Sequence, residues 1–190
     1  FTLAAALEQE FALRGQYWAG PATITVPDEG CMTNGVPWQP YNASDSSAGT
    51  VDLYGATQNS VNTVYAQLVV ALAEGPRDVV EMAHRLGIES ELPEVCSITL
   101  GSVQINPLEM TNGYATLADQ GTYHRANPLL EVNRPNGEPA DRRVSSPDRP
   151  KLEPVYANQV TYALQSVVSG GTGSSAAIPV EYVIRSCPRI

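Results

Sequence analysis

The stretch Ala56–Leu72, "ATQNSVNTVYAQLVVAL", changes character at Val61. Polar residues crowd its first third, and apolar residues then recur at helical spacing, at Val61, Val64, Tyr65, Leu68, Val69 and Leu72. This stripe predicts an amphipathic helix that begins near Ser60 and ends at Gly75-Pro76. Ser60 and Asn62 therefore fall one residue apart at the start of a helix.

Ser60 and Asn62 have two interpretations. In the first, the Ser60 hydroxyl accepts a hydrogen bond from a free amide of the first turn, and Asn62 simply sits in that turn. In the second, both side chains serve a site, where a hydroxyl relays a proton and a carboxamide offers a donor and an acceptor to a peptide-like substrate. The S-x-N pattern alone favours capping, because average composition produces it by chance in a chain of this length.

Composition and charge exclude several classes of protein. The 190 residues suit one domain or a large piece of one, and 43% hydrophobic against 16% charged residues predicts a packed core. The net charge of -9 disfavours nucleic-acid binding, because such a surface repels phosphates. The longest apolar run, Tyr65–Ala73, is too short to span a bilayer. The first residues, "FTLAAALEQEF", lack a starting Met and the features of a signal peptide, so we expect a fragment that enters a helix in its middle.

The residue types that bind metals and cofactors are scattered. Cys31, Cys96 and Cys187 form no CxxC or Cys/His cluster, so we expect no metal site. One disulfide with one free thiol and three reduced thiols are both compatible with this spacing. His84 and His124 are isolated, and no G-x-S-x-G pattern accompanies them. "GGTGSS" at 170–175 lacks the lysine of a phosphate loop and follows a helix, so it predicts a helix C-cap and no cofactor.

The remaining pattern is helix-rich with little strand, which predicts an α+β fold. Further helices are expected at 1–14, at 51–59 with Thr50 as N-cap, and at 77–86, 107–120 and 155–168. A strand is expected at 22–26, followed by an irregular loop at 27–50 that Trp38 and Tyr41 hold against the body. We also expect a partly extended connector at 92–102 and an extended "NPLLEV" within 122–132. Residues 133–154 predict a mobile proline-rich excursion, and a strand can form in 179–190.

Five stretches together resemble one family, in the order in which the family has them. They are "FTLAAALEQ" at the start, "WQPYNASDSSAGTVDLYGATQNSVNTVYAQL" at 38–68, "MAHRLGI" at 82–88, "SITLGSVQINPLEMTNGYATLADQGTY" at 97–123, and "VTYALQSVVSGGTGSSAAI" at 160–178. The chain thereby resembles the transpeptidase domain of class A (bifunctional) penicillin-binding proteins, and the block at 97–123 is the most specific match. The resemblance implies the helical part of the penicillin-binding protein/β-lactamase-like fold with its central sheet largely missing. Residues 1–178 would form a partial transpeptidase domain, and 179–190 a divergent tail.

The resemblance also assigns the site. The signature of this group is S-x-x-K, S-x-N and K-T-G, of which only the middle motif, Ser60 and Asn62, is present. The only lysine is Lys151, and the tail reads "PVEYVIRSCPRI" where K-T-G is expected. The nucleophilic serine and its lysine would therefore lie outside the chain, which we expect to be inactive alone.

In the complete family enzyme, the nucleophilic serine attacks the D-Ala-D-Ala bond of a peptidoglycan stem peptide and forms an acyl-enzyme. Ser60 would pass a proton to the departing D-alanine amine, and Asn62 would bind the acyl-side amide of the stem peptide or of a β-lactam. The implied parent is anchored at the extracytoplasmic face of the bacterial membrane, carries a separate glycosyltransferase domain, needs no cofactor or metal, and can meet other cell-wall synthesis proteins.

Two alternatives stay open. The chain could be a non-catalytic relative that binds peptidoglycan or protein, or a hydrolase of the β-lactamase or D,D-carboxypeptidase type. The "PLEM…YATLADQG" block favours the biosynthetic branch over the hydrolases.

Overall fold

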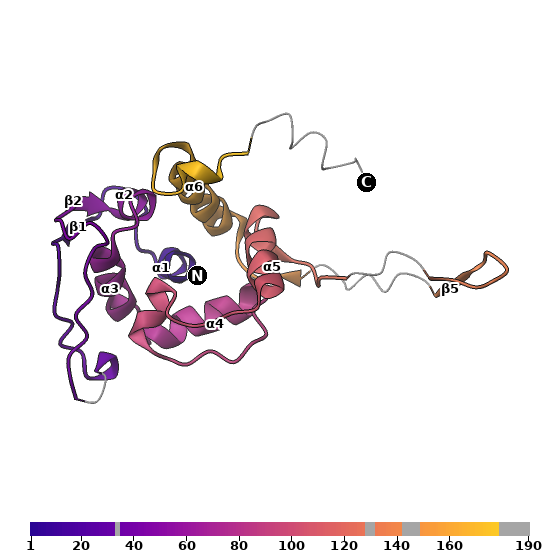
Figure 1. Cartoon of the computed structure of the whole chain (residues 1–190), viewed down its shortest axis with the longest axis horizontal. Coiled ribbons are helices and arrows are strands. Elements are labelled where there is room, and N and C mark those ends of the chain that lie inside the picture. The colour runs from indigo at the N-terminus through magenta and orange to yellow at the C-terminus, as the bar shows by residue number, and fades with distance from the viewer. Residues whose placement is uncertain (33–34, 128–131, 142–148, 179–190) are drawn as a thin grey trace.

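A ring of helices surrounds one short central helix in the computed structural model (Figure 1), which describes residues 1–32, 35–127, 132–141 and 149–178. The central helix is α1 (Thr2–Glu8). Around it lie α2 (Leu53–Gln58), α3 (Asn62–Ala71), α4 (Pro76–Leu86), α5 (Pro107–Ala118) and α6 (Pro154–Gly170). In the part of the chain that the structure describes, no helix is long and apolar enough to cross a membrane.

The central helix is buried because its side chains are small or apolar on every face. All residues from Thr2 to Leu7 are buried, and Ala4 and Ala6 have no exposed surface. Alanines allow the surrounding helices to approach closely, and burial of this surface is the main favourable term in the packing of the ring. The Arg85 guanidinium on α4 adds a polar link, since it donates to Glu8 at the end of α1 and to the Lys151 carbonyl, at 2.7 and 2.6 Å.

The predicted helix at 1–14 is wrong in its second half. The helix ends at Glu8, and Glu10 adopts a left-handed φ of 66°. The Gln9 side chain instead donates to Asp78 and accepts from the Ala73 amide, so tertiary hydrogen bonds replace a further helical turn. Leu13 is nevertheless buried in the core.

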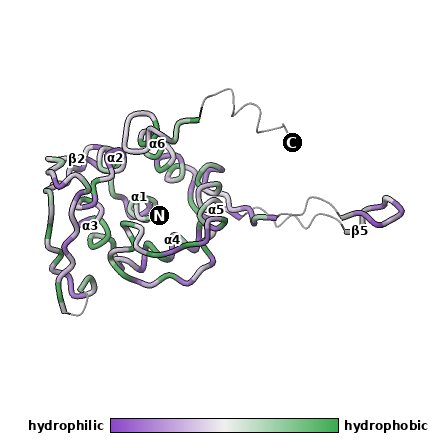
Figure 2. The backbone as a smooth tube through the Cα atoms, viewed as in Figure 1, coloured by the Kyte–Doolittle hydropathy of each residue, from purple (hydrophilic) through white to green (hydrophobic). Residues whose placement is uncertain are grey.

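The strands are short and pair in twos within the described residues, which confirms a helix-rich α+β fold. The antiparallel pair β1 (Tyr17–Gly20) and β2 (Gly49–Asp52) has Tyr17 opposite Asp52. The other pairs are β3 (Thr122–Tyr123) with β6 (Arg149–Pro150) and β4 (Val132–Asn133) with β5 (Pro139–Asp141). The surface excursion thus contains short strands, and Figure 2 shows mostly hydrophilic residues in the hairpin β4–β5.

The strand predicted at 22–26 is wrong. This segment makes only isolated bridges, from Thr23 to Tyr41 and from Val26 to Trp38. Proline on either side of it, at Pro21 and Pro27, removes backbone donors that a longer ladder would need. Trp38 packs against the core as predicted, whereas the Tyr41 side chain is 62% exposed and does not anchor the loop.

Some of the other local predictions are confirmed, and some are wrong. Helix α4 ends at Gly87 in the left-handed conformation, with φ 114°, and α5 begins at Pro107, as predicted. The N-cap of α2 is Asp52 rather than Thr50, because the Asp52 carboxylate accepts from the Gly55 amide at 2.8 Å. The 92–102 connector contains the 3-10 helix η2 (Cys96–Leu100) instead of an extended piece. Residues 128–131 and the tail at 179–190 lie outside the described residues.

A disulfide joins Cys31 to Cys96, with the two Cα atoms 5.2 Å apart. Cys31 ends the 3-10 helix η1 (Glu29–Cys31), and Cys96 begins η2. Both half-cystines are buried. Of the two thiol states left open by the sequence, the structure selects the one with a disulfide, which ties the long loop after β1 to the helical ring.

We predict that Cys31→Ser lowers the free energy of unfolding by about 4 kcal/mol and the melting temperature by roughly 10 °C, because it opens a loop of 65 residues in the unfolded chain. Cys96→Ser should have the same effect, and the double variant no larger one. Thermal unfolding with and without reductant measures this. Additive losses from the two single substitutions would show that the cysteines act independently.

Candidate functional site

Ser60 lies in the tight turn between α2 and α3. It has a φ of 53°, which is uncommon for a residue other than glycine. Its amide donates to the Thr57 carbonyl, and the next amide, of Val61, donates to Ala56. The N-cap position of α3 belongs to Val61 and carries no side-chain hydrogen bond. The capping interpretation of Ser60 is therefore wrong, and its side chain is exposed.

Asn62 is the first residue of α3 and is partly buried. Its carboxamide Nδ2 donates to the backbone carbonyl of Tyr41 at 2.8 Å. The following residue, Thr63, donates its amide hydrogen to Asn42 Oδ1 at 3.2 Å. The loop at Tyr41-Asn42 thus holds the beginning of α3 from a distance of about 20 residues in sequence.

The other side of the turn is fixed to the end of α6. The Gln58 carbonyl accepts from the Thr172 amide at 3.2 Å, and Gln58 Nε2 donates to the Ser166 carbonyl at 3.4 Å. Gly171 and Gly173 both donate their amides to the Val167 carbonyl, so "GGTGSS" caps α6 as predicted. The S-x-N turn is consequently held between α6 and the Tyr41-Asn42 loop.

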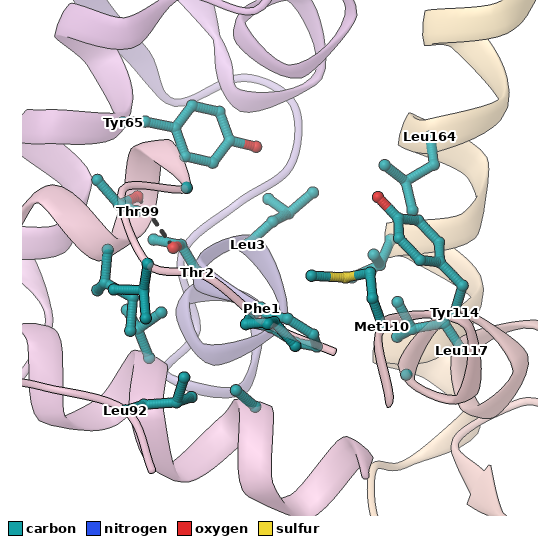
Figure 3. A pocket seen from close by; sticks show the side chains of 18 of the residues that line it. Phe1, Thr2, Leu3, Tyr65, Leu92, Thr99, Met110, Tyr114, Leu117 and Leu164 are labelled. Carbon is teal, nitrogen blue, oxygen red and sulfur yellow. Dashed lines mark hydrogen bonds between the residues drawn. The ribbon is translucent and has the colours of Figure 1, made fainter. Parts of the chain in front are cut away.

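A cavity of about 520 Å³ opens at the first residues of α1 (Figure 3). Most of its lining side chains are apolar, among them Phe1 and Leu3 at the start of α1, Met110 and Leu117 of α5, and Leu164 of α6. Ser60 and Asn62 are not among its lining residues. Thr57 and Tyr65, three residues before and after the motif, are. The motif is therefore adjacent to the cavity, which the start of α1 also lines, but Ser60 and Asn62 do not form its wall.

The cavity contains two pairs of hydroxyl groups. Thr57 Oγ1 donates to the Leu53 carbonyl at 2.6 Å, so Tyr65, whose hydroxyl oxygen lies 2.6 Å from Thr57 Oγ1, must donate to it. Thr99 Oγ1 donates to Thr2 Oγ1 at 2.9 Å (Figure 3). Burial raises the pKa of Tyr65 to about 12. Sequence reasoning placed Tyr65 only in an apolar stripe, because the periodicity gives no sign of a partner eight residues away.

The histidines have structural contacts. His84 Nδ1 lies 2.7 Å from the Ile88 carbonyl, and His124 Nε2 lies 2.6 Å from the Asp119 carboxylate. Within the described ranges, no three His, Cys, Asp or Glu side chains come together in a way that could hold a metal ion.

Comparison with known proteins identifies the family. The penicillin binding protein transpeptidase domain matches residues 1–184, and the chain belongs to this family. It is 29% identical over 192 residues to penicillin-binding protein 1A of Mycolicibacterium smegmatis, which covers 93% of this chain and 23% of the relative. It is also 29% identical over 176 residues to penicillin-binding protein 1B of Escherichia coli, covering 90% and 20%. The chain spans less than a quarter of these curated relatives.

Solved structures agree with this assignment. The PonA1 protein from Mycobacterium tuberculosis in complex with penicillin V has a TM-score of 0.74 at 28% identity, with 88% of this chain and 45% of that chain covered. The D,D-transpeptidase domain of a peptidoglycan glycosyltransferase from Eggerthella lenta has a TM-score of 0.72 at 23% identity, covering 94% and 49%. The second likeness supports the fold alone. Together they confirm the helical part of a transpeptidase fold.

We predict that Gly171→Ala loosens the contact between α2 and α6 and lowers the free energy of unfolding by about 1–3 kcal/mol. A Cβ at Gly171 would collide with the Gln58 carbonyl and lie 2.9 Å from Val167 Cα.

Gly170→Ala is the matched control. A Cβ there meets only Gln58 Nε2 at 3.5 Å, so stability should be unchanged or raised by up to about 1 kcal/mol. Urea denaturation of both variants measures the difference, and equal stabilities would contradict the close contact.

We predict that alkali weakens the fold through Tyr65. Because the folded pKa of Tyr65, about 12, is above the ordinary tyrosine value of 10.0, its contribution to the free energy of unfolding is fully present below pH 10 and is lost as pH rises to 12. The loss should approach roughly 2–3 kcal/mol. Tyr65→Phe should remove this part of the pH dependence. Urea midpoints between pH 9 and 12 measure it, and parallel profiles for the two proteins would contradict it.

Proposed function

We propose that the chain is the helical part of a peptidoglycan D,D-transpeptidase, which cross-links stem peptides through a serine acyl-enzyme. The observation that carries this proposal is the S-x-N motif at the start of α3 in a chain of the transpeptidase family. The motif lies on backbone that is fixed from two sides, at the Gln58 and the Asn62 ends. A catalytic side chain needs a fixed backbone of this kind to hold a reacting bond in the correct orientation.

Ser60 and Asn62 have distinct roles in the proposed reaction. The exposed Ser60 hydroxyl can both accept and donate, so it passes a proton to the D-alanine amine that departs. Asn62 donates one N–H to Tyr41, which leaves its other N–H and its carbonyl oxygen for the acyl-side amide of the substrate. The nucleophile and its lysine belong to the S-x-x-K motif, and K-T-G forms the opposite wall of the site. Neither motif is in these 190 residues, so the chain alone is inactive.

The parent protein is larger than this chain. The chain spans under a quarter of its curated relatives. We assign its residues 1–178 to a partial transpeptidase domain and its residues 179–190 to a divergent tail. The rest of the parent includes a separate glycosyltransferase domain and a membrane anchor. A buried disulfide suits an oxidising compartment, which supports a location at the extracytoplasmic face of the membrane.

The substrate in this proposal is the D-Ala-D-Ala end of a stem peptide, and β-lactams occupy the same site. The complex of the PonA1 relative with penicillin V supports the second part. Other cell-wall synthesis proteins are the expected protein partners.

Labelling with a fluorescent penicillin tests the proposal. We predict no labelling of the 190-residue chain and covalent labelling of the parent protein that carries it. Asn62→Ala in the parent should slow labelling at least tenfold, because the acyl-side amide loses its partner.

Three results of the labelling experiment decide between the functions. Labelling of the 190-residue chain itself would place the nucleophile inside it and refute the assignment. An unlabelled but folded parent would favour the non-catalytic binding relative. Labelling followed by rapid release of the acyl group to water would favour a hydrolase.

A further inference from the structure

The turn before α3 needs support that its own residues do not supply. Ser60 is in a left-handed conformation, which costs on the order of 1 kcal/mol for a residue with a side chain. Val61, at the N-cap position, has no side-chain acceptor for the free amides of the first turn. The acceptor must therefore come from another part of the chain.

Asn42 supplies this acceptor from the loop between β1 and β2. Its Oδ1 accepts from the Thr63 amide at 3.2 Å, the place where a local N-cap side chain would otherwise bind. Asn42 is 5% exposed and Thr63 is fully buried. Asn42 thus acts as the cap of a helix that begins 20 residues after it.

The other atoms of Asn42 fix the orientation of its carboxamide. Nδ2 donates to the carbonyls of Pro21 and Ser46, both at 3.0 Å. The Asn42 amide donates to the Ala22 carbonyl at 2.9 Å. Because carbonyls face Nδ2 on both sides, Oδ1 must be the atom that faces Thr63. One buried side chain therefore joins the segment after β1, its own loop and the start of α3.

Neighbouring contacts strengthen the same junction. Thr63 Oγ1 donates to the Pro21 carbonyl at 2.9 Å, and Asn62 Nδ2 donates to the Tyr41 carbonyl at 2.8 Å. Consecutive residues of the loop, Tyr41 and Asn42, thus hold consecutive residues of α3. The position of the Asn62 carboxamide follows from the position of the loop.

We propose that Asn42 is the positioning residue of the S-x-N turn, which it holds in the geometry that acyl transfer requires. The inference rests on the proposed function. Asn42 acts through the backbone of α3, because its side chain bonds to Thr63, Pro21 and Ser46 and does not contact the substrate. Its loss leaves the buried Thr63 amide without its acceptor, so the turn relaxes. A displacement of about 1 Å at a catalytic group can cost about 100-fold in rate.

The first test measures the rate of acylation. In the parent protein, Asn42→Ala should lower the second-order rate constant for fluorescent penicillin labelling at least tenfold. Asn59→Ala is the matched control, because the side chain of this exposed asparagine next to the turn bonds, among the described residues, only to the Gly55 carbonyl of α2. Val80→Ala, at a buried position of α4, controls for a general loss of stability. Both controls should label within twofold of the wild type when folded.

The second test measures hydrogen exchange in the 190-residue chain. In Asn42→Ala, amides at the start of α3, Thr63 to Tyr65, should exchange at least tenfold faster, while those of α4 keep their rates. In Val80→Ala, the amides of α4 should exchange faster, while those of Thr63 to Tyr65 keep their rates.

The two tests separate this inference from the proposed function. Unchanged exchange at Thr63, or wild-type labelling of Asn42→Ala, would overturn the positioning role. An unlabelled wild-type parent would overturn the proposed function and with it any role in acyl transfer. Exchange would then decide only whether Asn42 holds the turn.

Discussion

The burial of α1 on all sides determines where the other helices can lie. A helix whose residues from Thr2 to Leu7 are all buried must be surrounded, and α2, α3, α4, α5 and α6 lie around it. Each of these helices takes its place by packing an apolar face inward, as α4 does with Val79, Met82 and Leu86. The cavity at the first residues of α1 and the turn beside it are consequences of this arrangement.

The geometry of the motif comes from segments far away in sequence. The turn at Ser60 is tied on one side to residues that follow α6, through Gln58 and Thr172. It is tied on the other side to the loop between β1 and β2, through Asn42. That loop is in turn joined to η2 by the Cys31–Cys96 disulfide. Ser60 and Asn62 therefore lie at the surface end of a polar network that is buried at Asn42 and Thr63.

Local signals predicted the elements whose ends are set by Pro and Gly. Pro107 begins α5 and Gly87 ends α4, because fixed φ at one and a left-handed φ at the other act within a single turn of helix. The end of α1 at Glu8, the bridges of residues 22–26 and the pairing of the cysteines could not be predicted in this way. Each depends on a partner distant in sequence, such as Asp78 for Gln9.

In the candidate site, too, some features could be predicted from the sequence and others could not. Residue types and the resemblance were enough to propose Ser60 and Asn62 as site residues, since the motif is contiguous. The left-handed φ of Ser60, the cap supplied by Asn42 and the buried Tyr65 hydroxyl required coordinates. Periodicity reports which face of a helix is apolar, and it carries no information about which distant polar group faces a buried donor.

A crystal structure of the parent protein acylated by benzylpenicillin would show whether the S-x-N turn borders the reacting group. We expect the acyl group next to the α2–α3 turn, with the Asn62 carboxamide within hydrogen-bond distance of the ligand's side-chain amide. We also expect Ser60 to face the acylated serine. A ligand bound elsewhere, with Ser60 and Asn62 turned to solvent and remote from it, would refute the proposed roles of both residues.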